Sequence, residues 1–188
     1  LDDNFWSEDG LAWRRFRNTR WPTFWVQDGP VGSHRFKLRT TFTVEEMQWD
    51  WPVVANHYEA KAYCAWRSKR DAVNVPYRLL QEKGDLAIRE PGLQEATHWQ
   101  AGKSELLKLD RVMVDEAELA SVYEVNNNLH FGSESSVNRF AANSLGFNDV
   151  FGNVWQWCED TVYPLPGFSI HPYYVDYSTP CFDEKHHM

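Results

Sequence analysis

Apolar positions with a helical period make residues 56–70 the most clearly patterned part of the chain. Ala62 and Tyr63 precede Trp66 by four and three residues, so on a helix these three side chains share one face. Asn56 is a good N-cap, and Glu59 three residues later completes a capping box. The pattern therefore predicts a helix from Asn56 to Arg70.

Three other segments carry weaker patterns. Residues 34–43 alternate apolar and polar side chains, which predicts a half-exposed strand. Residues 75–80 predict a short extended run. Residues 82–89 predict a second helix, which the Pro-Gly pair that follows it would end.

The remaining segments are polar or rich in turns. Residues 92–122 are weakly patterned, and we interpret them as an insertion or a long loop. After residue 129, short extended segments alternate with turns rich in Gly, Ser, Asn and Pro. With 188 residues the chain is long enough for one domain. These elements predict a single α+β domain over residues 1–188, with one or two helices on a small twisted antiparallel sheet.

The aromatic content adds large flat side chains to this fold. The chain contains 10 Trp, 8 Tyr and 11 Phe, and each such side chain buries a large area while Trp and Tyr keep one polar group. We expect a core or a cleft built from them, with Trp155 and Trp157 in the core.

Charge and cysteine content argue against several classes of function. The net charge of −8 argues against a surface for nucleic acid or anionic membranes, because phosphates attract basic patches. No stretch is apolar enough for a transmembrane helix, and the first residues show no secretory signal pattern. Cys64, Cys158 and Cys181 are far apart and form no C-x-x-C pair, which favours buried thiols in a reducing, cytoplasmic setting.

One string is more specific than the rest. Residues 146–157 read Gly-Phe-Asn-Asp-Val-Phe-Gly-Asn-Val-Trp-Gln-Trp. Gly152 and Asn153 are turn residues, and the two tryptophans after them share one face of an extended segment. Such a turn also occurs in other β-rich cores. The full string, however, resembles the signature of the formylglycine-generating-enzyme superfamily, the sulfatase-modifying factors.

Three further segments resemble this superfamily in the same order along the chain. Residues 52–66 resemble its helix with the pattern E-A-x-A-[YF]-C-x-W, and residues 76–82 resemble its P-Y-R-L-P-T-E strand. Residues 167–183 narrow the resemblance to the sulfoxide synthases of thiol-histidine biosynthesis. The ovothiol branch, the 5-histidylcysteine sulfoxide synthases, is the nearer match, and the ergothioneine branch is the second.

The resemblance implies a C-type-lectin-like fold with little regular secondary structure, in a non-haem iron(II)- and O2-dependent oxidoreductase. Such enzymes join the thiol of cysteine, or of a cysteine peptide, to the imidazole of a histidine derivative, and the product is a sulfoxide. Their iron is held by three histidines of an N-terminal helical domain with an H-x-x-x-H element, which this sequence lacks. We therefore expect an incomplete domain without iron ligands, and a partner domain in the same polypeptide that supplies the metal.

The resemblance also assigns roles within residues 167–183. Tyr174 matches the family tyrosine placed near the activated oxygen, where a phenol can donate a proton or a hydrogen atom. Tyr177 matches a second tyrosine that contacts substrate, and His171 is a further candidate for substrate binding or acid–base chemistry. The alternative for these residues is a structural role, with partly buried rings and satisfied polar atoms.

The loop at residues 149–156 matches a calcium-binding loop of the formylglycine-generating enzymes. Its candidate oxygen ligands are Asp149, Gln156 and the carbonyls of Val150, Gly152 and Val154. Oxygen atoms from a turn suit a hard cation, but Gln156 replaces the usual glutamate and so removes one negative charge. We favour a hydrogen-bonded turn without an ion.

Two further candidates come from charged residues. Asp50 lies between Trp49 and Trp51, where it is placed to meet a cationic substrate group beside aromatic faces. Arg78 and Glu82 are expected to form a buried pair or an internal contact, of the kind that often organises a polar core.

Two other functions stay open. A formylglycine-generating enzyme, which oxidises a cysteine of a sulfatase, needs two closely spaced cysteines, and neither Cys158 nor Cys181 has such a neighbour. A non-catalytic binding module on the C-type-lectin-like fold is the other possibility. Tyr174 and Tyr177 favour the sulfoxide synthase.

Overall fold

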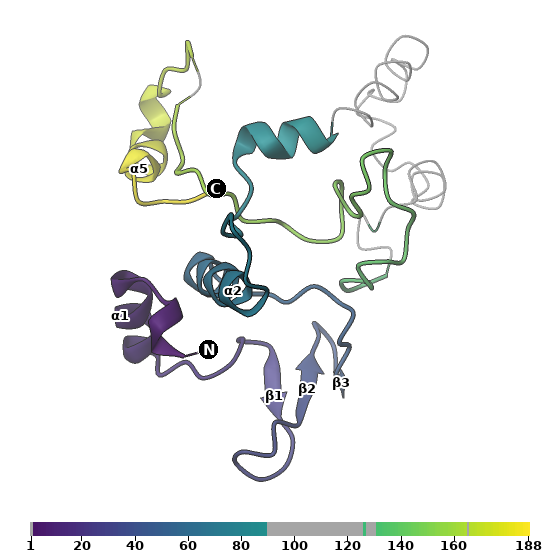
Figure 1. The fold of residues 1–188 in the computed structure, drawn as a ribbon. Helices are drawn as coiled ribbons and strands as arrows, with labels where there is room; N and C mark the ends of the chain where they lie inside the picture. The colour runs from purple at the N-terminus through teal and green to yellow at the C-terminus, as the bar shows by residue number, and fades with distance from the viewer. Residues whose placement is uncertain (1, 90–125, 127–130, 165) are drawn as a thin grey trace. The chain divides into compact units, whose positions relative to one another are not determined.

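The computed structural model describes residues 2–89, 126, 131–164 and 166–188, whose path is drawn in Figure 1. The chain divides into two compact units. The first unit comprises Leu1–Arg20, Ala55–Gly84 and Gln156–Met188, and the second comprises Trp21–Val54 and Asp85–Trp155. The expected insertion at residues 92–122 lies outside the described residues, and one domain over residues 1–188 stays a prediction.

The first unit begins with a short 3-10 helix, Asp3–Phe5, and the helix α1, Glu8–Arg17 (Figure 1). Ser7 caps α1, because its hydroxyl accepts the N–H of Gly10 at 3.1 Å. Acidic side chains in the first turn and arginines in the last turn fit the helix macrodipole. The helix ends at Asn18, whose φ of 49° is left-handed.

The helix predicted from the sequence is confirmed as α2, His57–Arg70. The side chain of Asn56 accepts the N–H of Glu59, and the side chain of Glu59 accepts the N–H of Asn56, both at 2.9 Å. The predicted capping box is therefore complete. Ala62 on this helix is buried. Tyr58 packs against Trp13 of α1, with 6.2 Å between the ring centroids.

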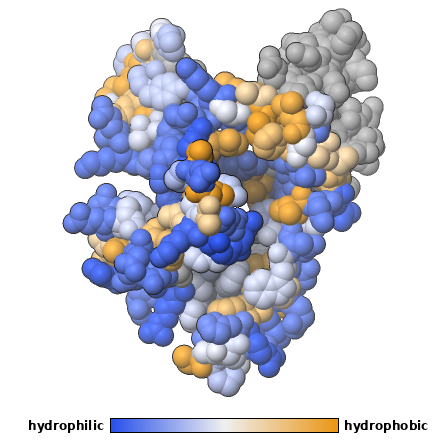
Figure 2. Space-filling view, in the orientation of Figure 1, coloured by the Kyte–Doolittle hydropathy of each residue, from blue (hydrophilic) through white to orange (hydrophobic). Residues whose placement is uncertain are grey.

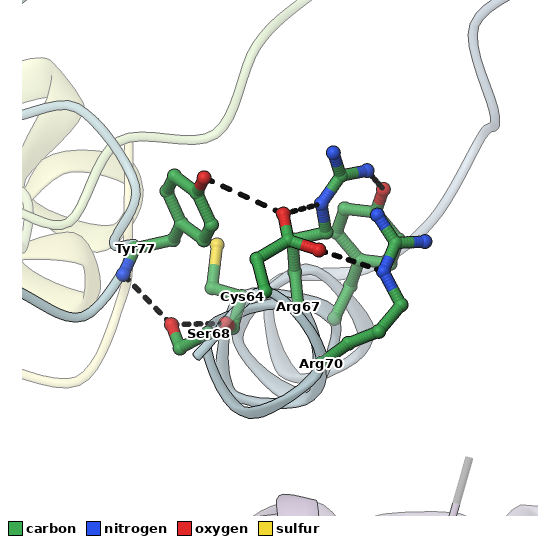
Figure 3. A network of polar contacts seen from close by, with 7 residues as sticks. Cys64, Arg67, Ser68, Arg70 and Tyr77 are labelled. Atoms are coloured by element: carbon green, nitrogen blue, oxygen red, sulfur yellow. Dashed lines mark hydrogen bonds and ion pairs between the residues drawn. The ribbon is translucent and has the colours of Figure 1, made fainter. Parts of the chain in front are cut away.

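A polar network closes the C-terminal end of α2 (Figure 3). The hydroxyl of Ser68 donates to the carbonyl of Cys64 and accepts the N–H of Tyr77, both at 2.7 Å. One side chain therefore ties the last turn of the helix to the extended run at residues 75–80.

Asp71, which follows α2 directly, accepts hydrogen bonds from Arg67 Nε at 2.5 Å and Arg70 Nε at 2.8 Å. The bonds from Arg70 and then Arg67 hold the pKa of Asp71 below its usual value. Because the folded pKa is the lower one, this stabilisation is present above about pH 4 and is lost as the pH falls through the folded pKa.

We expect Asp71→Asn to lower the melting temperature at about pH 7 by a small amount, since the carboxylate lies near the surface. The difference in melting temperature between the variant and the parent chain should shrink as the pH falls toward about 2. Thermal unfolding followed by circular dichroism at both pH values measures the difference. An equal loss at both pH values would show that the charge of Asp71 is not what stabilises the turn.

Residues 82–89 are helical, as the sequence predicts. The predicted pair of Arg78 with Glu82 is wrong, because each of the two residues has a different hydrogen-bond partner. Glu82 accepts the hydroxyl of Tyr163, and its N–H donates to Asp160 Oδ2 at 2.7 Å. Arg78 is exposed and donates to the carbonyl of Leu79 at 3.0 Å.

The second unit contains a three-stranded antiparallel sheet in the order β1-β2-β3 (Figure 1). Its strands are β1, Trp25–Gln27, β2, Phe36–Arg39, and β3, Val44–Glu46. Trp25 faces Leu38 across β1 and β2, and its ring packs on Phe36 with 5.3 Å between centroids. Aromatic packing of this kind stabilises a small sheet that buries little aliphatic surface.

The strand predicted over residues 34–43 is shorter at both ends than expected. At its start His34 has a left-handed φ of 52°, which an extended strand does not allow. At its end the N–H of Thr40 donates to the carbonyl of Thr43 at 2.9 Å, so residues 40–43 form the turn into β3.

Helices and a small antiparallel sheet confirm the α+β class, but the predicted tryptophan core is wrong. Trp155 is fully exposed and Trp157 is 41% exposed. A shared inward face requires a regular strand, and residues 155–157 form none. Hydrophobic side chains reach the surface at several places among hydrophilic ones (Figure 2). In the described part of the chain, no helix combines the length and the apolarity needed to cross a membrane.

Candidate functional site

The loop with the predicted catalytic tyrosine folds into successive short helical turns (Figure 1). A 3-10 helix, Pro172–Tyr174, leads into α5, Val175–Ser178, and a second 3-10 helix, Thr179–Phe182, follows. Proline suits the first position of such a turn, because its missing N–H would have no partner there. The loop thus holds its aromatic residues on short rigid elements.

His171 caps the first of these turns. Its Nδ1 accepts the N–H of Tyr173 at 3.3 Å, and its carbonyl accepts the N–H of Tyr174 at 2.8 Å. Because Nδ1 acts as an acceptor, the neutral ring carries its proton on Nε2. The structural role expected as an alternative for His171 is therefore present, and it leaves an N–H donor on the other side of the ring.

Three predicted site residues lie together on this loop, and we call His171, Tyr174 and Tyr177 the tyrosine cluster. The ring centroid of Tyr174 lies 5.9 Å from that of His171 and 6.4 Å from that of Tyr177. Tyr174 is 59% exposed and Tyr177 is 80% exposed, so neither phenol is sealed in hydrocarbon. Two phenols and an imidazole in one exposed cluster can both stack on and hydrogen-bond a flat heteroaromatic group.

Asp50 belongs to the second unit, whereas the tyrosine cluster belongs to the first. The carbonyl of Asp50 accepts the N–H of Val137 at 2.9 Å. The adjacent Trp49 is exposed and meets Trp25 edge to face, with 5.5 Å between ring centroids. An exposed carboxylate beside an exposed tryptophan stays a predicted position for a cationic group.

In the second unit, the candidate calcium loop is organised by Asn153, which the sequence identified only as a turn residue. The side chain Nδ2 donates to Asp149 Oδ2 at 2.8 Å and to the carbonyl of Ser135 at 3.1 Å. The side chain Oδ1 accepts from the N–H of Ser135 at 2.9 Å and from Asn126 Nδ2 at 3.1 Å. The backbone of Asn153 donates to the carbonyl of Asn126 at 2.7 Å. One amide therefore joins three segments of the chain.

This geometry supports the hydrogen-bonded turn that we favoured over a calcium site. Asp149 Oδ2 accepts the N–H of Asn153, so this carboxylate takes part in the hydrogen bonds of the turn. A calcium ion bound at this loop stays a prediction.

The family resemblance predicts that the iron ligands lie outside this chain. Among the residues with a described position, no group of three or more His, Cys, Asp or Glu side chains is arranged to hold a metal ion.

A second cluster, which the sequence did not single out, lies in the first unit where α2 meets the C-terminal segment. The rings of His57 and His187 stack with 3.6 Å between centroids and 11° between planes. Nearby, Lys61 forms an ion pair with Glu159 Oε1. His57 Nε2 and Glu159 Oε2 are buried and have no hydrogen-bond partner among the described residues. Burial lowers the pKa of His57, and the charges of His187 and Lys61 lower it further.

The sequence offered only part of the signal for this cluster. In the sequence, His186 and His187 are adjacent. In the structure His186 Nδ1 pairs with Asp183 at 2.8 Å, and His187 turns to His57 instead. A contact between residues so far apart in the chain has no local pattern that predicts it.

The cysteines are all free thiols. Burial raises the pKa of Cys64, and the charge of Glu159 raises it further. Cys64 is therefore protonated at neutral pH and suits a structural role, since the thiolate is the reactive form.

Comparison with known proteins places these features in context. Residues 4–178 match the sequence profile of the Sulfatase-modifying factor enzyme 1-like domain. The chain is also similar to proteins described as hercynine oxygenase from Mycolicibacterium thermoresistibile and Mycolicibacterium smegmatis, each 26% identical over 181 residues. The alignments cover 95% of this chain and 34% and 36% of the two relatives. The chain thus spans about a third of the length of these curated relatives.

Proposed function

Because the chain belongs to the family of sulfatase-modifying factor enzyme 1-like domains, we propose that it is the substrate-side domain of a longer sulfoxide synthase. The proposed reaction joins the thiol of cysteine, or of a cysteine peptide, to the imidazole of a histidine derivative. Similarity to two hercynine oxygenases along 95% of the chain carries this proposal. An N-terminal helical domain of the longer protein would hold iron(II), which activates O2.

The proposed reaction is balanced with O2 as the oxidant. The imidazole C–H and the thiol S–H bonds break, and a C–S bond forms. One oxygen atom ends in the S=O group and the other leaves as water with the two hydrogens. Carbon and sulfur together lose four electrons, which O2 takes up.

The tyrosine cluster supplies the groups that this chain contributes. The Tyr174 phenol is an exposed O–H donor and serves as the proton source near the forming sulfoxide. Tyr177, 6.4 Å away between ring centroids, offers a second phenol for substrate binding. His171 keeps Nε2–H as a donor, because its Nδ1 accepts the N–H of Tyr173. This Nε2–H is suited to an anionic group of the substrate, such as a carboxylate.

The longer protein that carries this segment, purified with iron(II), tests the proposal directly. With cysteine and a histidine derivative present, we expect sulfoxide formation and one O2 consumed per product, followed by an oxygen electrode and mass spectrometry. Hercynine is the first substrate to test, because of the relatives' description, and histidine, the substrate of the ovothiol branch, is the second. Oxidation of a sulfatase cysteine peptide in place of C–S bond formation would overturn the proposal.

A further inference from the structure

The loop that carries the tyrosine cluster leaves and rejoins the first unit at one place. Thr161 and His187 form an antiparallel bridge. Beside it the N–H of Val162 donates to the carbonyl of His186 at 2.7 Å. The segments before and after the tyrosine cluster are therefore paired with each other at Thr161–His187 and Val162–His186.

His187 ties these paired segments to α2 by its ring. It stacks on His57 with 3.6 Å between centroids, and the ring of Trp157 meets His57 edge to face at 5.9 Å. His57 Nε2 is buried and has no hydrogen-bond partner in the described part of the chain. Two neutral imidazoles can stack in this way, whereas a proton on His57 would place a charge on a partly buried ring. A backbone hydrogen bond with Cys158 favours the charged form of His57, but burial has the larger effect and the pKa is lowered. His187 Nδ1 lies 3.3 Å from the carbonyl oxygen of Asp160.

The charged groups around His57 also oppose protonation. His187 faces it from the returning segment and Lys61 from its own helix, and both repel a cation. Glu159 faces it from the segment after Trp157 and attracts a cation. One oxygen of this carboxylate, however, is already paired with Lys61, which leaves it less able to compensate a second positive charge.

We propose that His57 and His187 form a pH-sensitive clasp between α2 and the Thr161–His187 bridge, closed while His57 is neutral and loosened when His57 takes up a proton. The clasp itself does not depend on the proposed function, whereas its effect on Tyr174 chemistry rests on it. Because the pKa of His57 is lowered in the folded chain, the closed clasp binds fewer protons than the open one. Its stability is therefore present above about pH 6.5 and falls as the pH drops below that value.

Hydrogen exchange of backbone amides in the substrate-free chain, followed by NMR, tests this directly. The Val162 amide reports the clasp, because its N–H bonds the returning segment. After correction for intrinsic exchange, the equilibrium constant for local opening at Val162 should rise between pH 7.5 and pH 5.5, by up to about tenfold for one added proton with an open-state pKa near 6.5. An opening constant that changes less than about twofold would overturn the proposal.

Two variants separate the stack from general acid sensitivity. His57→Phe keeps a ring under His187 but removes the buried titrating group, so its opening constant should not change with pH. His186→Gln removes the neighbouring imidazole, which pairs with Asp183 at 2.8 Å, and should keep the pH dependence of the parent chain. The same pH dependence in His57→Phe as in the parent chain would refute the clasp.

A measurement on the unsubstituted chain covers the case in which His57→Phe does not fold. The ring protons of His57 and His187, followed by NMR against pH, should show that His57 titrates below the usual histidine range. Independent titration of both rings near pH 6.5 would refute the clasp. Neither experiment uses substrate, so a failure of sulfoxide formation would leave the clasp standing and a failed clasp would leave the proposed reaction standing.

Discussion

Replacement of Tyr174 by phenylalanine in the longer enzyme should slow sulfoxide formation by about 100-fold or more, because general acid catalysis contributes factors of that size. The substitution removes only the phenol O–H. The ring stays in contact distance of His171 and Tyr177, whose centroids lie 5.9 Å and 6.4 Å away. The loss should therefore fall on kcat, while KM for the histidine derivative should change little.

Tyr173→Phe is the matched control for this experiment. Tyr173 is the adjacent residue on the same 3-10 helix, is 89% exposed, and has no role in the proposed chemistry beyond its backbone N–H. Its substitution should leave kcat within about threefold of the parent enzyme. Rates of O2 uptake and the ratio of sulfoxide to cysteine sulfinic acid measure both variants. An unchanged rate and product ratio in Tyr174→Phe would show that Tyr174 is not the proton donor.

The parts of the fold that the sequence predicted are those determined by neighbours in the chain. The capping box of Asn56 and Glu59 and the helix at residues 82–89 depend on spacings of a few residues. Such elements carry their own signal in propensity and period. The strand at residues 34–43 was predicted too long, because the left-handed φ of His34 breaks the alternation without any change in polarity.

The parts that escaped prediction depend on contacts between distant segments. Glu82 pairs with Tyr163 instead of Arg78, and His57 stacks on His187. A polar side chain that becomes buried needs a hydrogen-bond partner, but the sequence does not show which partner the fold brings near. The tyrosine cluster was found because the family resemblance, and not the local pattern, pointed to Tyr174 and Tyr177.

The largest loss of stability is expected from Asn153→Ala in the second unit. The amide of Asn153 donates to Asp149 and Ser135 and accepts from Ser135 and Asn126. Ser135 is 4% exposed and Asn126 is 6% exposed, so water cannot easily replace the lost partner. A buried polar group left without its partner costs about 1–3 kcal/mol. Alanine would also adopt a left-handed backbone, since φ at this position is 59°.

We therefore expect Asn153→Ala to reduce the free energy of unfolding by about 3 kcal/mol, as the sum of these two effects. Urea unfolding followed by tryptophan fluorescence gives the value. Asn153→Gly should recover about 1 kcal/mol of the loss, because glycine adopts the left-handed backbone without strain. The difference between the two variants separates the backbone contribution from that of the side-chain hydrogen bonds.

Asn148→Ala is the control within the same loop. Asn148 Nδ2 donates to the carbonyl of Phe140 at 2.8 Å, but at an exposed position, where water replaces the lost bond. Its loss should stay below about 1 kcal/mol. If Asn153→Ala costs no more than Asn148→Ala, then Asn153 does not organise the loop. If the cost is larger by the expected amount, the side-chain hydrogen bonds of Asn153 hold the Gly-Asn turn.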